Sequence, residues 1–170
     1  MIRDRNVEMV IEQGSIEDAA EILDLQKLAY QSEAEIYNDF SLPPMTQTLE
    51  QIQTDFENQL FLKASIEGRI VGSVRGRLDN ETCHIGRLIV HPEFQNRGIG
   101  GRLMKEIEDR FSQAARFELF TGHLSERNLR FYGKLGYKEF SAKKITDNLT
   151  LVFLEKYRVE IQIKKRKWVE

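Results

Sequence analysis

A glycine-rich segment with several polar residues stands between an apolar segment and an amphipathic one. Leu88–Val90 is apolar, Pro92 follows it, and residues 95–101 have the sequence Gln-Asn-Arg-Gly-Ile-Gly-Gly. Glycine lets main-chain N–H groups approach an anion closely, and the start of a helix adds partial positive charge at the same place. A strand, a glycine-rich turn and a helix start therefore predict a site for a phosphorylated ligand.

Two common phosphate-binding motifs do not fit this turn. A P-loop needs a Lys-Ser/Thr pair directly after its second glycine, and none follows Gly100. A dinucleotide fingerprint needs a third glycine where this chain has Leu103, and it usually opens its domain. A strand-to-helix turn without a ligand is the remaining alternative. It accounts for one glycine, but not for two beside Gln95 and Arg97.

The overall composition is that of an ordinary globular domain. The 170 residues are 41% hydrophobic and 31% charged, and the net charge of −2 disfavours a nucleic-acid-binding protein, which needs a basic excess. The single cysteine, Cys83, fits a reducing compartment. No secretory signal and no apolar run of membrane-spanning length is visible. We therefore expect a cytoplasmic protein that has neither nucleic acid nor a membrane as a partner.

Hydrophobic periodicity predicts the elements that position the turn. Strands are expected over residues 7–11, 60–66, 70–78, 82–90, 117–121, 137–142 and 149–157. Helices are expected from the cap at Ser15 to Tyr30, over 46–58, from the glycine turn to Ala114, and over 126–135. Asp18, three residues after Ser15, favours a capping box at the first helix start.

This order of elements predicts one domain over residues 1–170 with an α/β fold. We expect a mixed, mostly antiparallel sheet of about seven strands with helices on both faces. The connection from Val90 to Phe117 should be a right-handed parallel crossover. We interpret residues 159–170 as a C-terminal extension, with a strand over 159–163 that offers an edge for a homodimer. The basic run 164–167 is interpreted as a solvated tail.

The glycine turn and a second block downstream resemble one known family. Val90-His-Pro followed by Gln95–Gly100 resembles the acetyl-CoA signature, Gln/Arg-x-x-Gly-x-Gly/Ala, of the GNAT superfamily of N-acetyltransferases. Residues 125–137, which end in Tyr-Gly-Lys-Leu-Gly-Tyr, look like that family's Asn-x₆-Tyr-x-Lys-Leu-Gly-Phe/Tyr block. The resemblance extends in element order from the first strand to about Tyr157. It implies acetyl-CoA as co-substrate, with no metal.

The resemblance implies contacts to the cofactor from one strand and one turn. The strand contacts fall on Leu88, Ile89 and Val90. The N–H of Val90 would face the thioester carbonyl as an oxyanion donor. Gln95 would order the turn, and main-chain N–H groups for the pyrophosphate would come from Asn96, Arg97, Gly98, Ile99, Gly100 and Gly101.

The downstream block implies further contacts and a general acid. Tyr132 occupies the position of the family's general acid, which protonates the departing CoA thiolate, although a core tyrosine is the plainer alternative. The family usually has Asn seven residues earlier, where this chain has Ser125. Asn128 is a second candidate for that cofactor contact. Both residues have an alternative role in capping or covering the helix.

The general base is left open. The resemblance implies direct attack by the amine with no covalent enzyme intermediate, and an amine with a Lys-like pKa of about 10.4 must first lose a proton. The Glu that some family members use falls on Phe120 in this chain. His123 is the best local substitute, since an unperturbed imidazole has a pKa of about 6.5. His84, Glu33 and Glu35 are further candidates, and each has a plain alternative as an exposed polar residue.

The resemblance therefore predicts an acetyl-CoA-dependent N-acetyltransferase that acts on a primary amine. The acceptor is a small-molecule or peptide amine whose identity stays open. Two alternatives also stay open: a non-catalytic acyl-CoA-binding or sensing domain, and a transferase of a longer acyl group.

Overall fold

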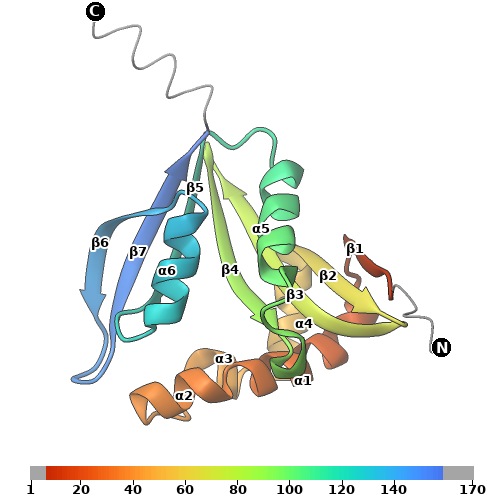
Figure 1. Ribbon diagram of the computed structural model, residues 1–170, viewed down its shortest axis with the longest axis horizontal. Coiled ribbons are helices and arrows are strands. Elements are labelled where there is room, and N and C mark those ends of the chain that lie inside the picture. Colours follow the sequence, from red (N-terminus) through yellow and green to blue (C-terminus); the bar gives the residue numbers. More distant parts are fainter. Residues whose placement is uncertain (1–6, 159–170) are drawn as a thin grey trace, which may run out of the picture.

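The computed structural model describes residues 7–158, which form one sheet and the helices that cover it (Figure 1). The strands are β1 (Met9–Gln13), β2 (Leu60–Ile66), β3 (Arg69–Asp79), β4 (Thr82–Val90), β5 (Arg116–Gly122), β6 (Lys138–Lys144) and β7 (Thr150–Tyr157). The helices are α1 (Ala19–Ala29), α2 (Gln31–Tyr37), α3 (Pro43–Thr46), α4 (Leu49–Asn58), α5 (Ile99–Arg110) and α6 (Glu126–Lys134), with 3-10 turns η1 (Ile16–Asp18) and η2 (Pro92–Phe94). The predicted extension over 159–170, with its strand and basic run, lies outside the described residues.

The seven strands form one sheet in the order β1-β2-β3-β4-β5-β7-β6. Every neighbouring pair is antiparallel except β4 and β5. The predicted fold class, a mixed and mostly antiparallel sheet with helices on both faces, is confirmed. The predicted strands lie within two residues of the observed ones, because their alternating burial is visible in the sequence.

The helix expected over 46–58 begins three residues later than predicted, at Leu49. Pro43–Thr46 forms the separate short helix α3, and α4 starts at Leu49. Thr48 caps α4, since its Oγ1 accepts a hydrogen bond from the Gln51 N–H at 3.2 Å. The Gln51 side chain accepts from the Thr48 N–H at 2.9 Å in return, which completes a capping box and fixes the helix start.

The parallel pair β4–β5 is joined along a short part of its length. β5 pairs with β4 only where Thr82–His84 face Arg116–Glu118, whereas β5 pairs with β7 along its whole length. Beyond His84 the two strands diverge, and the gap between them, here called the fork, opens toward α1 and α2 (Figure 1). A β-bulge in β4 at Arg87 (φ 50°) lies where the strands part, and such bulges bend a strand.

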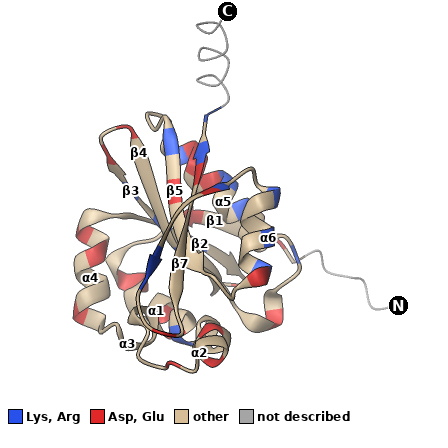
Figure 2. Ribbon diagram, turned by 90° about the vertical axis from the view of Figure 1, so that its left-hand side faces the viewer, with Lys and Arg blue, Asp and Glu red and all other residues tan. Residues whose placement is uncertain are grey.

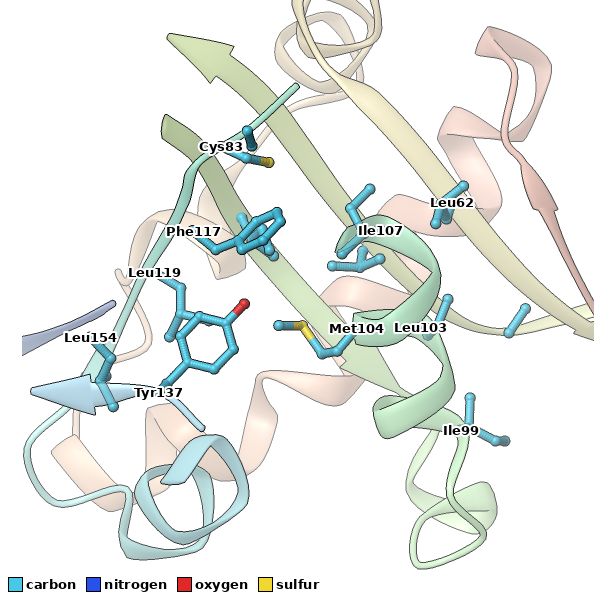
Figure 3. Packing of buried hydrophobic residues seen from close by; sticks show 14 of the residues in the cluster. Leu62, Cys83, Ile99, Leu103, Met104, Ile107, Phe117, Leu119, Tyr137 and Leu154 are labelled. Carbon is cyan, nitrogen blue, oxygen red and sulfur yellow. The ribbon is translucent and has the colours of Figure 1, made fainter. Parts of the chain in front are cut away.

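Helix α5 lies on one face of the sheet, and its buried side chains point toward both arms of the fork (Figure 3). Its buried residues are Ile99, Leu103, Met104 and Ile107. The helix comes very close to β3, because a Cβ at Gly72 would lie only 3.0 Å from a methyl group of Leu103. This close packing fixes the start of α5, and with it the glycine turn, relative to the sheet.

The pair α1–α2 lies on the other face and crosses the open end of the fork. On the β4 side, Ile22 of α1 packs in a buried cluster with Ile70 and Ile89. On the β7 side, Tyr37 of α2 packs in a separate buried cluster with Leu149. Since α1 belongs to one arm and α2 to the other, the residues near their junction are held over the fork.

Lys and Arg alternate with Asp and Glu along the elements seen in this view (Figure 2). This mixture agrees with the net charge of −2. Within residues 7–158, no helix is long and apolar enough to cross a membrane. In the same part of the chain, no group of three or more His, Cys, Asp or Glu side chains is placed to hold a metal ion.

Candidate active site

A cavity of about 820 Å³, here called the main cavity, occupies the open end of the fork. Its walls are the end of β4, the glycine turn with the start of α5, the start of α6, and the junction of α1 with α2. Ligand pockets usually measure about 300–1,000 Å³, so this cavity has room for a large ligand.

The main cavity brings together most of the residues that the sequence predicts for cofactor binding. Its lining includes Leu88, Ile89, Val90, Gln95, Asn96, Gly98, Ile99, Gly100, Gly101, Ser125 and Asn128. Three predicted residues, Arg97, His123 and Tyr132, do not line it. The Arg97 guanidinium instead lies over the Phe94 ring, 4.9 Å from its centroid.

The glycine turn has the backbone that an anion site needs. Gly98 has a φ of 78° and is the cap residue of α5, and Asn96 also has a left-handed backbone with a φ of 61°. The Gly98 carbonyl accepts from the Arg102 N–H at 3.1 Å, which begins the helix directly after the turn. The first N–H groups of α5 therefore lack helical partners and lie at the wall of the main cavity.

The end of β4 offers main-chain groups to the fork. The N–H of His91 donates to the Val71 carbonyl at 2.8 Å, so His91 and Val71 form a hydrogen-bonded pair across β3 and β4. Hydrogen-bonding directions alternate along an antiparallel pair, and the main-chain groups of Val90 consequently face away from β3. They face the fork, where β5 makes no ladder with β4.

Helix α6 adds a row of cations to the main cavity that the sequence analysis did not identify. Arg127, Arg130 and Lys134 all line it, and their spacing places them on adjacent turns of the helix. Arg127 donates to the Gln95 side-chain oxygen at 2.6 Å and to the Asn96 side-chain oxygen at 3.1 Å. Among the described residues, Arg130 and Lys134 have no hydrogen-bond or ion-pair partner. The sequence signal for this row was the helical spacing of the three basic residues inside the predicted block, residues 125–137.

A carboxylate from α2 also lines the main cavity and is held by the start of α6. One oxygen of Glu33 accepts a hydrogen bond from the Ser125 Oγ at 2.5 Å, and the other accepts from the Asn128 side chain at 3.4 Å. The Ser125 Oγ has a second partner, the Tyr37 hydroxyl, at 2.8 Å. The Tyr37 oxygen in turn accepts from the Leu124 N–H at 3.0 Å.

The direction of each hydrogen bond in this chain of contacts is determined. Ser125 has one hydroxyl proton and donates it to Glu33, so the Tyr37 hydroxyl must donate to Ser125. The Tyr37 hydroxyl also lies so close to Gly122 that a Cβ there would overlap it. The Glu33 carboxylate is therefore fixed at the wall of the cavity. Glu35, the alternative considered from the sequence, is exposed and does not line the cavity.

Tyr132 lies on α6 beside the core. Its ring packs against those of Phe131 and Tyr137, with centroids 5.2 and 6.0 Å away. Burial raises the pKa of the Tyr132 phenol, and the nearby Tyr30 and Glu33 raise it further. The hydroxyl makes no hydrogen bond to a described residue and is not enclosed. The phenol is therefore protonated at neutral pH, and it lies behind the lining residues of the main cavity rather than among them.

His123 does not line the main cavity, and its imidazole is held by contacts to other parts of the chain. Its Nδ1 lies 3.0 Å from the Thr150 N–H, which can only donate, so the Nδ1 lone pair is engaged. The neutral imidazole then carries its proton on Nε2. The ring packs against Tyr37, with centroids 5.9 Å apart. This arrangement favours a role for His123 in joining α2 to β7.

Cys83 is fully buried, and burial raises the pKa of its thiol to about 12. The thiolate is the nucleophilic form of cysteine, so this residue is unsuited to accept an acyl group. Cys83 belongs to the core cluster beside α5 and does not line the main cavity.

The fold thus combines a cavity between two diverging parallel strands with a glycine turn at the wall of that cavity. The sequence model of the acetyltransferase (GNAT) family matches residues 20–137. This match covers more than half of the chain, and the chain therefore belongs to the GNAT family. The resemblance found in the glycine turn and the Tyr132 block is confirmed.

Known proteins are similar to this chain over part of their own length. UPF0157 protein YqkA of Bacillus subtilis strain 168 is 28% identical over 155 residues, which are 89% of this chain and 45% of that protein. The chain spans about half the length of the curated relatives it matches.

Solved structures of low sequence identity share the fold. One is a GNAT-family acetyltransferase from Streptococcus pneumoniae (TM-score 0.71, 17% identity, 89% of this chain and 100% of that one). Another is the PaiA N-acetyltransferase of Thermoplasma acidophilum in complex with coenzyme A (TM-score 0.65, 19% identity, 89% and 99%).

Proposed function

We propose that this chain is a single N-acetyltransferase domain that moves an acetyl group from acetyl-CoA to a primary amine by direct attack. The observation that carries the proposal is the main cavity itself. It joins the glycine turn, the open main chain of β4 and the fixed Glu33 carboxylate in one space.

The residues of the main cavity fit acetyl-CoA. The free N–H groups at the start of α5 suit the pyrophosphate, and the cations of α6 add positive charge beside it. The open main chain of Val90 suits a pantetheine arm that lies along β4 as an added strand. When bound, acetyl-CoA supplies the thioester, and the Val90 N–H is placed to stabilise negative charge on its carbonyl oxygen.

In this mechanism Glu33 is the general base. An ammonium group must lose a proton before it attacks. Glu33 lines the main cavity and is held in one position by Ser125 and Asn128. It takes over the role that the sequence analysis gave first to His123. Ser125, predicted as a cofactor contact, is instead proposed to position Glu33.

Tyr132 is the general acid in this mechanism. Its raised pKa keeps a proton on Oη at neutral pH, where the departing thiolate can receive it. Glu33 lies near enough to the Tyr132 phenol to raise its pKa, and this proximity supports the pairing of the two residues in one mechanism. Glu33 approaches from α2 and Tyr132 from α6, so the amine and the thiol are handled from different elements.

Replacing Tyr132 by Phe tests the proposal, because it removes the acidic hydroxyl and keeps the ring. We expect kcat to fall by about 10²–10⁴-fold, the usual contribution of a general acid, while the affinity for CoA stays within about twofold. Thiol release with acetyl-CoA and a broad panel of amines gives kcat, and calorimetric titration gives the affinity. Tyr157→Phe, at the end of β7, is the matched control and should leave both unchanged.

Two results would contradict the proposal in different ways. Tight binding of acetyl-CoA without transfer to any amine in the panel would favour a non-catalytic acyl-CoA-binding domain. Tighter binding and faster transfer with longer acyl thioesters than with acetyl-CoA would favour a transferase of a longer acyl group.

A further inference from the structure

Arg87 stands at the β-bulge of β4, in a backbone conformation that residues other than glycine seldom adopt. Its φ of 50° lies in the left-handed region. Ile85 belongs to the core under α5, and strict alternation along the strand would place Arg87 on that same face. Arg87 instead lies over Tyr30, which packs with the α1 cluster on the opposite face. Bulges beside active sites redirect side chains in this way, and strained backbone is concentrated at functional sites.

Tyr30 connects Arg87 to the main cavity. The Arg87 guanidinium lies 6.0 Å from the centroid of the Tyr30 ring, and Tyr30 lines the cavity together with Glu33. The Ala34 N–H donates to the Tyr30 carbonyl at 2.9 Å, so the helical turn continues through the junction of α1 with α2. Tyr30 and Glu33, three residues apart, are therefore neighbours on one helical face.

The charges of Arg87 and Glu33 both act on the Tyr30 phenol. Burial raises the pKa of this phenol, Arg87 opposes the rise, and Glu33 adds to it. Arg87 itself is not among the lining residues of the main cavity, but it is partly exposed and directly precedes Leu88, which is one of them. Arg87 and Glu33 thus lie beside the same tyrosine at the edge of the main cavity.

The positive charge of Arg87 is not compensated. Within residues 7–158, Arg87 has no ion-pair partner. The nearby Arg75, by contrast, donates to Asp55 at 2.5 Å and to Gln26 at 2.7 Å. Burial lowers the pKa of Arg75 to about 10, and repulsion by Arg87 contributes to the decrease. A carboxylate bound to Arg87 would offset this repulsion, and it could accept two parallel hydrogen bonds from the guanidinium.

We propose that Arg87 binds the carboxylate of the acceptor, and that the acceptor is a free amino acid whose amine lies at Glu33. At neutral pH an amino acid carries an ammonium group and a carboxylate, which match the separated charges of Glu33 and Arg87. The cations of α6 line the cavity beside the glycine turn and suit the cofactor instead. This inference rests on the proposed acetyl transfer, and it assigns the acceptor class that the overall composition leaves open.

Amino acids and their carboxamides test this inference, because each pair shares the amine and the side chain and differs in the carboxylate. The ratio of wild type to variant, taken for each acceptor separately, removes the difference between the pKa values of the two amines. Arg87→Gln should lower kcat/KM about 10–100-fold for the amino acids and leave the carboxamides within about twofold. Arg87→Lys keeps the charge without the planar fork and should cause a smaller loss.

Arg77→Gln is the matched control, since Arg77 is an exposed arginine of the neighbouring strand β3 and does not line the main cavity. It should alter neither class of acceptor. The affinity for acetyl-CoA, measured by calorimetric titration, should stay within about twofold in all three variants, which shows that they are folded. An equal loss for amino acids and carboxamides in Arg87→Gln would overturn the inference, because it would indicate a role in supporting Tyr30 alone.

The proposed function and the inference can fail separately. Transfer to amines without a carboxylate, but to no amino acid, would overturn the inference and leave the proposed function standing. Absence of transfer to every amine would remove the proposed function and the inference with it.

Discussion

The glycine-turn wall and the α2 wall of the main cavity are built in opposite ways. The turn wall consists of consecutive residues, and its binding groups are main-chain N–H groups at the start of α5. The α2 wall depends on side chains that meet from distant places, since Glu33 and Ser125 are 92 positions apart in the sequence. The proposed binding of acetyl-CoA therefore depends on a short continuous segment of the chain, whereas the proposed proton-transfer chemistry depends on the tertiary fold.

This difference has an energetic consequence. A main-chain donor survives most side-chain substitutions, so single changes in the turn wall should have modest effects on binding. In the α2 wall each function rests on one or two side-chain atoms, and one substitution removes it. Three substitutions test this contrast, each read as a change in kcat or in the affinity for acetyl-CoA.

Glu33→Gln should have the largest effect of the three. Glutamine keeps the size of the side chain but cannot accept a proton at neutral pH, so kcat should fall by about 10²–10⁴-fold. The affinity for acetyl-CoA, measured by calorimetric titration, should stay within about twofold because the turn wall is intact. An unchanged kcat would show that another group is the base, and His123→Ala would then identify or exclude the imidazole.

Ser125→Ala sharpens the contrast, because the two interpretations of Ser125 predict different results. Loss of the hydrogen bond to a charged Glu33 should lower kcat about tenfold and leave the affinity for acetyl-CoA unchanged. If Ser125 is instead a cofactor contact, as the family pattern implies, titration should show weaker binding of acetyl-CoA at nearly constant kcat. Ser125→Thr retains the hydroxyl and should preserve most of the activity.

Arg127→Met should have the smallest effect, since it removes a side chain that supports the turn from outside. The two hydrogen bonds to Gln95 and Asn96 are exposed, and exposed charged contacts contribute about 0.2–1 kcal/mol. We therefore expect acetyl-CoA to bind up to about fivefold more weakly at low salt, with kcat unchanged. Arg110→Met is the matched control. If Arg127→Met weakened the binding of acetyl-CoA by a larger factor than the factor by which Glu33→Gln lowers kcat, the contrast would be reversed.

The sequence predicts the fold and the turn wall well for the same physical reason. Strand alternation, the Ser15–Asp18 capping box and the glycine spacing are local properties, and the observed elements follow them closely. The start of α4 was predicted three residues too early, because the cap at Thr48 was not recognised. Glu33 was one of several candidates for the base, and its place at the main cavity could not be told from that of Glu35 in the sequence, because it depends on the crossing of α1–α2 over the fork. The pairing of His123 with Thr150 depends on a contact between distant segments in the same way.

The short seam between β4 and β5 also bears on how the domain unfolds. Within residues 7–158, main-chain hydrogen bonds connect the two half-sheets only along the short segment from Glu81 to His84, so elsewhere side-chain packing must hold them together. A ligand lying along Val90 would fill the fork and add contacts between the two half-sheets. Such a ligand binds only the folded state, and it should therefore make the two half-sheets melt as one cooperative unit at a higher temperature.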